Sequence, residues 1–148
     1  MPKIELEEIA QTNRTSYPPP FDRQVAGRWY RRLAPATGLT DFGVSHVVLK
    51  PGAWSSQRHW HDGEDEFLVM LSGEAVLVED DGPTVLRAGD CVAFPKGVRD
   101  GHHLRNDSGT DCAFIVVGGG EFTGGGYSDI DMLFTADDRY VHKDRSPY

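Results

Sequence analysis

Short apolar segments separated by turn residues recur from about residue 43 onward, and this pattern constrains the fold more than any other feature of the chain. Val, Phe, Leu and Ile dominate these segments, and none keeps an apolar face at the 3.6-residue period of a helix. The segments are residues 44–49, 66–71, 74–78, 84–86, 91–94, 102–104 and 113–117. Strands of about five residues with Gly, Pro or Asp turns about every 8–12 residues predict an all-β sandwich or barrel.

The two ends of the chain differ from this middle region. Residues 17–21 read Tyr-Pro-Pro-Pro-Phe, a stiff segment that cannot enter a central strand, and the pattern at residues 29–33 predicts a short helix or an irregular arm. Glycine triplets at 118–120 and 124–126 are interpreted as flexible loop. We expect an N-terminal arm (1–42), a barrel core (43–117) and a C-terminal arm (118–148) in one domain. Aromatic residues in both arms predict packing on the barrel or on a partner subunit, with frayed termini as the alternative.

The charge and composition of the chain argue against several classes of protein. Fifteen Lys and Arg against 23 Asp and Glu give 148 residues a net charge of −8, which disfavours binding to nucleic acid or to an anionic membrane. No apolar run approaches the ~20 residues that span a bilayer, and the first ten residues lack the apolar core of a signal peptide. Two cysteines, Cys91 and Cys112, are too few for a disulfide scaffold. We expect a cytoplasmic protein with both thiols reduced and packed in the core.

Four of the six histidines fall into two tight groups that could meet in a β structure. His59 and His61 flank Trp60, and alternation along a strand points both imidazoles to one face. Glu66 begins the next apolar segment, so a turn at 62–65 would bring its carboxylate opposite the two imidazoles. A third imidazole comes from His102 or His103, which follow the Pro-Lys-Gly turn at 95–97.

Three neutral imidazoles and one carboxylate on rigid strands suit a divalent transition metal, namely Fe, Mn, Ni, Zn or Cu. Ligands that all come from one side leave positions open for water or substrate, as catalytic metal sites require. Calcium or magnesium would need more oxygen ligands than this set offers.

The turn residues around the histidines give this cluster its specificity. Gly52 precedes His-x-His, four residues separate His61 from Glu66, and six more lead to Gly73. Downstream, Gly89 is followed after five residues by the Pro-x-Gly at 95–97, then by the histidine pair and Asn106. This arrangement resembles the two motifs of the cupin superfamily, Gly-x5-His-x-His-x3–4-Glu-x6-Gly and Gly-x5-Pro-x-Gly-x2-His-x3-Asn.

The resemblance spans about residues 43–117 and implies a double-stranded β-helix, or jelly-roll, barrel with one metal inside. In the family the metal is held by the positions that match His59, His61, Glu66 and His102. Six residues rather than five precede His59, and the extra residue falls in a loop. Four rather than two separate Gly97 from His102, so His103 is the alternative ligand, although the three-residue gap to Asn106 favours His102.

Strand alternation also proposes residues for a substrate pocket. Gln57 has the parity of His59 and His61, so it either reaches the metal-bound ligand or bonds a loop backbone. The expected apolar wall, whose alternative reading is plain barrel core, comprises Leu68, Met70, Phe94 and Leu104, with core the preferred reading for Met70. No acid–base residue follows from parity, and Asp100 is better explained as a solvated loop acid.

Small bacterial cupins that look like this chain are labelled as sugar-phosphate isomerases or have no assigned function. We therefore expect a metal-dependent cupin that acts on a small oxygen-rich molecule, such as a sugar or keto acid, as an isomerase or dioxygenase. The alternative is a non-catalytic cupin in which the metal only orients a bound sugar or other small molecule. A phosphate group is disfavoured because Arg58 and Arg105 have the wrong parity, while Lys96 and Arg99 lie in a rim loop. The resemblance also implies a homodimer.

Overall fold

The computed structural model describes residues 3–148, which are mostly strand, turn and loop. The strands are β1 (Arg28–Arg32), β2 (Gly43–Leu49), β3 (His59–His61), β4 (Glu64–Ser72), β5 (Glu74–Glu79), β6 (Gly82–Arg87), β7 (Cys91–Phe94), β8 (His103–Arg105), β9 (Cys112–Gly120), β10 (Gly124–Tyr127), β11 (Leu133–Thr135) and β12 (Tyr140–Val141). Helical structure in this range consists of a 3-10 turn, η1 (Leu6–Glu8), and one short α-helix, α1 (Leu33–Thr37). The all-β fold predicted from the sequence is confirmed. No helix between residues 3 and 148 is long and apolar enough to cross a membrane.

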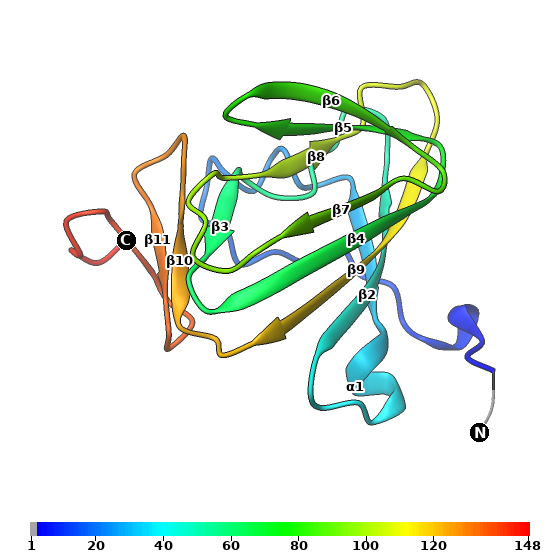
Figure 1. Ribbon diagram of the computed structural model, residues 1–148, viewed down its shortest axis with the longest axis horizontal. Helices are drawn as coiled ribbons and strands as arrows, with labels where there is room; N and C mark the ends of the chain where they lie inside the picture. The colour runs from blue at the N-terminus through cyan, green and yellow to red at the C-terminus, as the bar shows by residue number, and fades with distance from the viewer. Residues whose placement is uncertain (1–2) are drawn as a thin grey trace.

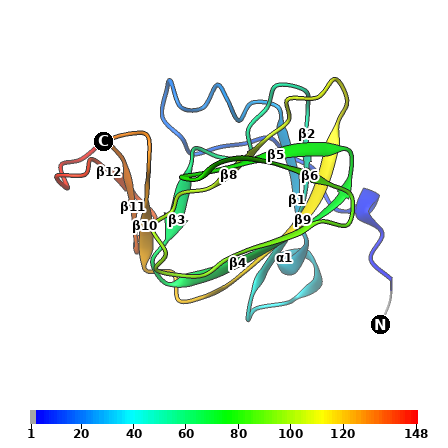
Figure 2. The ribbon, with the colours of Figure 1, turned by 45° about the horizontal axis from the view of Figure 1, so that its top comes forward.

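Antiparallel sheets enclose the interior of the protein on three sides. A five-stranded sheet has the order β1-β2-β9-β4-β7, and a three-stranded sheet has the order β6-β5-β8. Figure 2 shows the three-stranded sheet above β4 and β9, with β3, β10 and β11 closing one end. That end is a four-stranded sheet of order β12-β11-β10-β3, which Figure 1 shows beside the ends of β4 and β7.

The core lies between the five-stranded and three-stranded sheets. Along β4, Leu68 and Met70 are buried while Phe67 and Leu71 are exposed, so one face of the strand points inward. Leu77 of β5 and Leu104 of β8 pack against this face from the opposite sheet. Burial of each such side chain contributes about 1.5–3 kcal/mol.

The interpretation of the two glycine triplets as flexible loop is wrong. Gly118–Gly120 belong to β9, and Gly124–Gly126 begin β10, which pairs with β3. A Cβ atom at Gly125 would collide with the carbonyl oxygen of Trp60, and one at Gly126 would collide with the Trp60 ring. Glycine is therefore needed here for the close approach of two strands and not for mobility.

The N-terminal arm also contributes a strand. Trp29 and Tyr30 lie in β1, which pairs along β2 from Arg28 opposite Leu49 to Arg32 opposite Ser45. The prediction of a short helix or irregular segment is therefore wrong for Trp29 and Tyr30, and the helix begins only at Leu33. Residues 28–32 adopt a strand because β2 would otherwise have an unpaired edge.

Candidate metal centre

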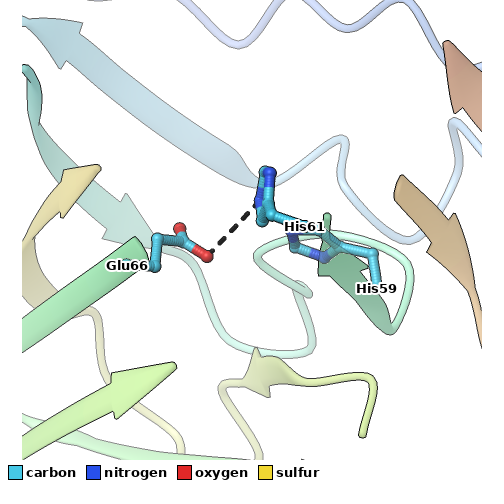
Figure 3. Close-up of side chains that lie close together, drawn as sticks. All are labelled: His59, His61 and Glu66. Atoms are coloured by element: carbon cyan, nitrogen blue, oxygen red, sulfur yellow. Dashed lines mark hydrogen bonds and ion pairs between the residues drawn. The ribbon is translucent and has the colours of Figure 1, made fainter. Parts of the chain in front are cut away.

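Strand β3 directs two imidazoles into the interior. Its residues pair with β10, with His61 opposite Gly125 and His59 opposite Tyr127, so His59 and His61 share one face as alternation predicts. Glu66 reaches the same place from the neighbouring strand β4. Figure 3 shows the two imidazoles and the Glu66 carboxylate directed toward one another.

A backbone bridge brings the third imidazole to this point. The N–H of His102 donates to the carbonyl of His59 over 2.9 Å, and the N–H of His59 donates to the carbonyl of His102 over 3.2 Å. The His102 ring centroid lies 5.0 Å from that of His59, and its Nε2 lies 3.0 Å from Glu66 Oε2. The structure thus gathers four side chains, called the histidine–glutamate cluster below: His59, His61, Glu66 and His102.

The alternative histidine has different partners. His103 Nδ1 lies 3.0 Å from the carbonyl oxygen of Ser56, and the His103 ring packs edge-on against Trp54 at 4.6 Å. His103 is buried, although alternation predicts that it points out of the barrel. Its burial follows from the loop around Trp54, which covers this side of β8.

The donor atoms of the cluster have spacings that suit a metal ion. His59 Nε2 lies 3.1 Å from His61 Nε2, and Glu66 Oε2 lies 3.6 Å from His61 Nε2. Ligand atoms of His59, His61 and Glu66 all lie within 4.8 Å of one another. Metal–ligand bonds of about 2.0–2.2 Å separate donors at right angles by about 3 Å. The residues present therefore fit a divalent transition metal.

Burial and mutual charge set the protonation of the cluster. Burial lowers the pKa of His59 to about 3, with His102 and His61 acting in the same direction and Glu66 opposing them. Burial by itself would raise the pKa of Glu66, but the hydrogen bond to His102 and the nearby imidazoles lower it to about 2. A neutral imidazole and an ionised carboxylate at neutral pH are the forms that bind a metal.

The outer nitrogen of His59 is held by its own loop. His59 Nδ1 lies 3.0 Å from the carbonyl oxygen of Gln57 and 3.1 Å from Ser56 Oγ. Donation from Nδ1 to the carbonyl leaves the Nε2 lone pair facing the cluster. His61 Nδ1 is 3.2 Å from Glu64 Oε2 but lacks hydrogen-bond geometry there.

A cavity of about 400 Å³ adjoins the cluster, and some of the predicted pocket residues line it while others do not. Leu68, Phe94 and Leu104 line the cavity. Gln57 does not, because its Nε2 donates to the carbonyl of Phe21 and to Gln24 Oε1. Met70 does not either, since it lies in the core with 1% of its surface exposed.

Residues of both arms that the sequence interpretation did not assign to the site also line this cavity. Tyr17, Tyr127 and Tyr140 meet there, and the Tyr17 ring centroid is 5.7 Å from each of the other two. Arg28, at the start of β1, is a further lining residue. The aromatic content of the arms was the available signal for the tyrosines. Parity within the barrel segments could not reveal Arg28, because its strand was not predicted.

Comparison with known proteins gives a family match and a structural match that both point to the cupin family. The family model described as Cupin domain matches residues 45–118. A crystal structure from Silicibacter pomeroyi, described as a sugar phosphate isomerase from a cupin superfamily, is 40% identical with a TM-score of 0.94, covering 99% of this chain and 96% of that one.

Two curated relatives match over shorter stretches. Protein SchB of Streptomyces halstedii is 31% identical over 97 residues, which are 65% of this chain and 68% of SchB. The oxalate-binding protein of Thermotoga maritima is 32% identical over 73 residues, which are 49% of this chain and 58% of that protein. The family match and the structural match confirm the double-stranded β-helix barrel expected from the motifs.

Proposed function

Because the chain belongs to the cupin family, we propose that it binds one divalent transition metal at the histidine–glutamate cluster and acts there on a small oxygen-rich organic molecule. The observation that carries this proposal is the convergence of the donor atoms of His59, His61 and Glu66 within 4.8 Å of one another, with His102 Nε2 3.0 Å from Glu66 Oε2. His102 acts as the fourth ligand in this proposal and His103 does not, because Glu66 lies against His102.

The cavity beside the cluster suits a substrate with several oxygen atoms. Burial raises the pKa of Tyr17 to about 12, opposed by a hydrogen bond with Tyr127, and burial also raises the pKa of Tyr127. Both hydroxyls stay protonated at neutral pH, so they can donate hydrogen bonds to substrate oxygens but cannot serve as bases. Leu68, Phe94 and Leu104 supply an apolar wall that limits water at the reacting groups.

A bound divalent metal would supply a Lewis acid that polarises a carbonyl or enediol oxygen. Such polarisation serves an isomerisation, and the Silicibacter pomeroyi protein described as a sugar phosphate isomerase supports isomerase chemistry over oxygenation. A non-catalytic binder of the same kind of molecule is the second candidate, because similarity to the Thermotoga maritima oxalate-binding protein favours it.

Metal analysis and turnover together test these candidates. Purified protein exposed separately to Fe(II), Mn(II), Ni(II), Zn(II) and Cu(II) is expected to retain about one metal per chain, and His59→Ala is expected to retain none. His142, which is half-buried and paired with Asp131 outside the cluster, offers a matched control, since His142→Ala is expected to keep the metal. Absence of stoichiometric metal from the wild-type protein would contradict the proposal.

A screen of aldoses, ketoses, sugar phosphates and keto acids then separates enzyme from binder. Isomerisation that depends on metal and disappears in His59→Ala supports the enzyme. Saturable ligand binding without turnover supports the binder, and oxygen consumption with Fe(II) identifies an oxygenase. The homodimer and the cytoplasmic location stay predictions, and light scattering of the purified chain tests the first.

A further inference from the structure

Arg28 brings a permanent positive charge to the cavity that holds the histidine–glutamate cluster. It lies at the start of β1, opposite Leu49 of β2, and is the one Arg or Lys that lines this cavity in the described part of the chain. The carboxylates on the same cavity belong to Glu66, inside the cluster, and to the exposed Asp138. This cation overturns the argument from parity against an anionic substrate.

The guanidinium group of Arg28 is held in place without being neutralised. Nη1 donates to the carbonyl oxygen of Ser55 over 2.8 Å, and Nη2 donates to that of Arg14 over 3.4 Å. Arg28 Cζ also lies 5.2 Å from the ring centroid of Tyr30. Neutral carbonyls and an aromatic ring orient the group but leave its charge uncompensated.

The hydrogen-bonding capacity of this guanidinium is only partly used. Arg28 Nε is buried and has no hydrogen-bond partner, and no carboxylate between residues 3 and 148 lies within ion-pair distance of Arg28. Arg58 shows the contrast, since it is similarly shielded but is clamped by Asp80 at 2.8 Å and by Asp129 at 3.0 Å. A guanidinium with open N–H groups matches a planar or tetrahedral oxyanion.

The charge of the whole chain makes such a local cation necessary for an anionic ligand. A net charge of −8 repels anions at long range. Within the cavity, a divalent metal would outweigh the single negative charge of Glu66, and Arg28 adds a further positive charge to the lining. Both charges would attract a ligand that carried an anionic group.

We propose that Arg28 binds an anionic group of the substrate, a carboxylate or a phosphate, while other substrate oxygens face the histidine–glutamate cluster. This inference rests on the proposed function and adds the substrate class, a small oxygen-rich anion. It also assigns to β1, in the N-terminal arm, a direct role in recognition.

Binding of three probes tests the proposal. Inorganic phosphate is followed by ³¹P NMR, and gluconate and its neutral counterpart glucose by saturation-transfer NMR, each on metal-free and on Zn(II)-loaded protein. The variants are Arg28→Gln, which removes the charge, and Arg28→Lys, which keeps the charge but loses the planar fork. Arg23→Gln, at an exposed position outside the cavity, controls for the loss of one positive charge.

Arg28→Gln is expected to weaken binding of an anionic probe by about ten-fold or more, with glucose binding unchanged. Arg28→Lys is expected to be intermediate, and Arg23→Gln to match the wild type. A response to phosphate alone or to gluconate alone identifies which oxyanion the site takes. Equal anion binding by wild type and Arg28→Gln would overturn the proposal, as would a wild-type protein that binds neither phosphate nor gluconate more strongly than glucose.

Circular dichroism shows whether each variant folds, and its Zn(II) content shows whether it binds metal. Loss of anion binding can therefore be distinguished from misfolding and from loss of the metal. If Arg28→Gln does not fold, Arg28→Lys decides, because a position with no contact to the anion would tolerate that change. If the wild type takes none of the five metals, the proposed function fails, whereas the phosphate titration of metal-free protein still tests Arg28 alone.

Discussion

The ring of Phe94 lies parallel to the imidazole of His102, with ring centroids 3.5 Å apart and 2° between the planes. Phe94 ends β7 and lies opposite Glu66 of the neighbouring strand β4. The register of these two strands therefore places the aromatic ring beside the carboxylate, which contacts the His102 imidazole. The stack leaves His102 Nε2 aimed at Glu66 Oε2. Phe94 therefore acts as a positioning residue for the cluster.

Replacement of Phe94 by Ala is expected to weaken metal binding by about ten-fold, because groups that orient ligands typically contribute that much. Competition with a chelator of known affinity measures the change. Phe67→Ala is the matched control, since Phe67 lies on the outer face of β4 with 45% of its surface exposed. Equal losses in the two variants would contradict a positioning role for Phe94.

The stability of the metal-free protein is expected to fall as the pH drops below about 6.5. Burial lowers the pKa of folded His59 to about 3, so between these values the unfolded chain binds a proton that the folded chain does not. One such group gives a slope of up to about 1.4 kcal/mol per pH unit. Below pH 4.5, Glu66 adds a loss of the same sign, because its folded pKa is about 2.

Urea unfolding from pH 8 to pH 5 measures this slope. Burial also lowers the pKa values of His46 and His103, which contribute in the same direction, so His59→Asn is needed to isolate one group. The variant is expected to lose part of the slope below pH 6.5 and none above pH 7.5. An unchanged slope would show that His59 titrates normally in the fold.

Gly125→Ala is expected to destabilise the protein by about 1–3 kcal/mol and to abolish metal binding. The added methyl group would collide with the carbonyl oxygen of Trp60 and with the Phe134 ring, which forces β10 away from β3. Gly109→Ala is the control, because a Cβ there meets nothing within 4 Å. Thermal unfolding and metal content check both variants, and retention of metal by Gly125→Ala would contradict the account of β3.

The two thiols are expected to react differently with iodoacetamide. Cys91 is exposed, which corrects the prediction that both cysteines lie in the core, whereas Cys112 is fully buried. Burial raises the pKa of Cys112 to about 11, so little thiolate forms near neutral pH. Mass spectrometry should find one label per native chain, on Cys91, and two after denaturation.

The sequence predicted strands correctly where apolar and polar side chains alternate along the chain. It did not predict strands that lack this alternation. The segment 91–94 became β7 with the same bounds, and Glu66, Leu68 and Met70 share a face as expected. Glycine has no side chain to alternate, so β10 was interpreted as loop although Trp60 packs against it. Gln57 shows the other limit. Its parity left open a metal-bound ligand or a loop backbone as its partner, and its amide donates to the backbone carbonyl of Phe21 and to Gln24, whose approach depends on tertiary structure.

The histidines of β3 depend on a strand that is translated much later. Within the described chain, β3 pairs as a strand with β10 alone, and the positions opposite His59 and His61 are Tyr127 and Gly125. A nascent chain that has emerged only to residue 120 has both imidazoles, Glu66 and the backbone bridge between His59 and His102, but it lacks the strand that pairs along β3. We therefore expect the proposed metal site to be complete only after the glycine triplet at 124–126 has left the ribosome.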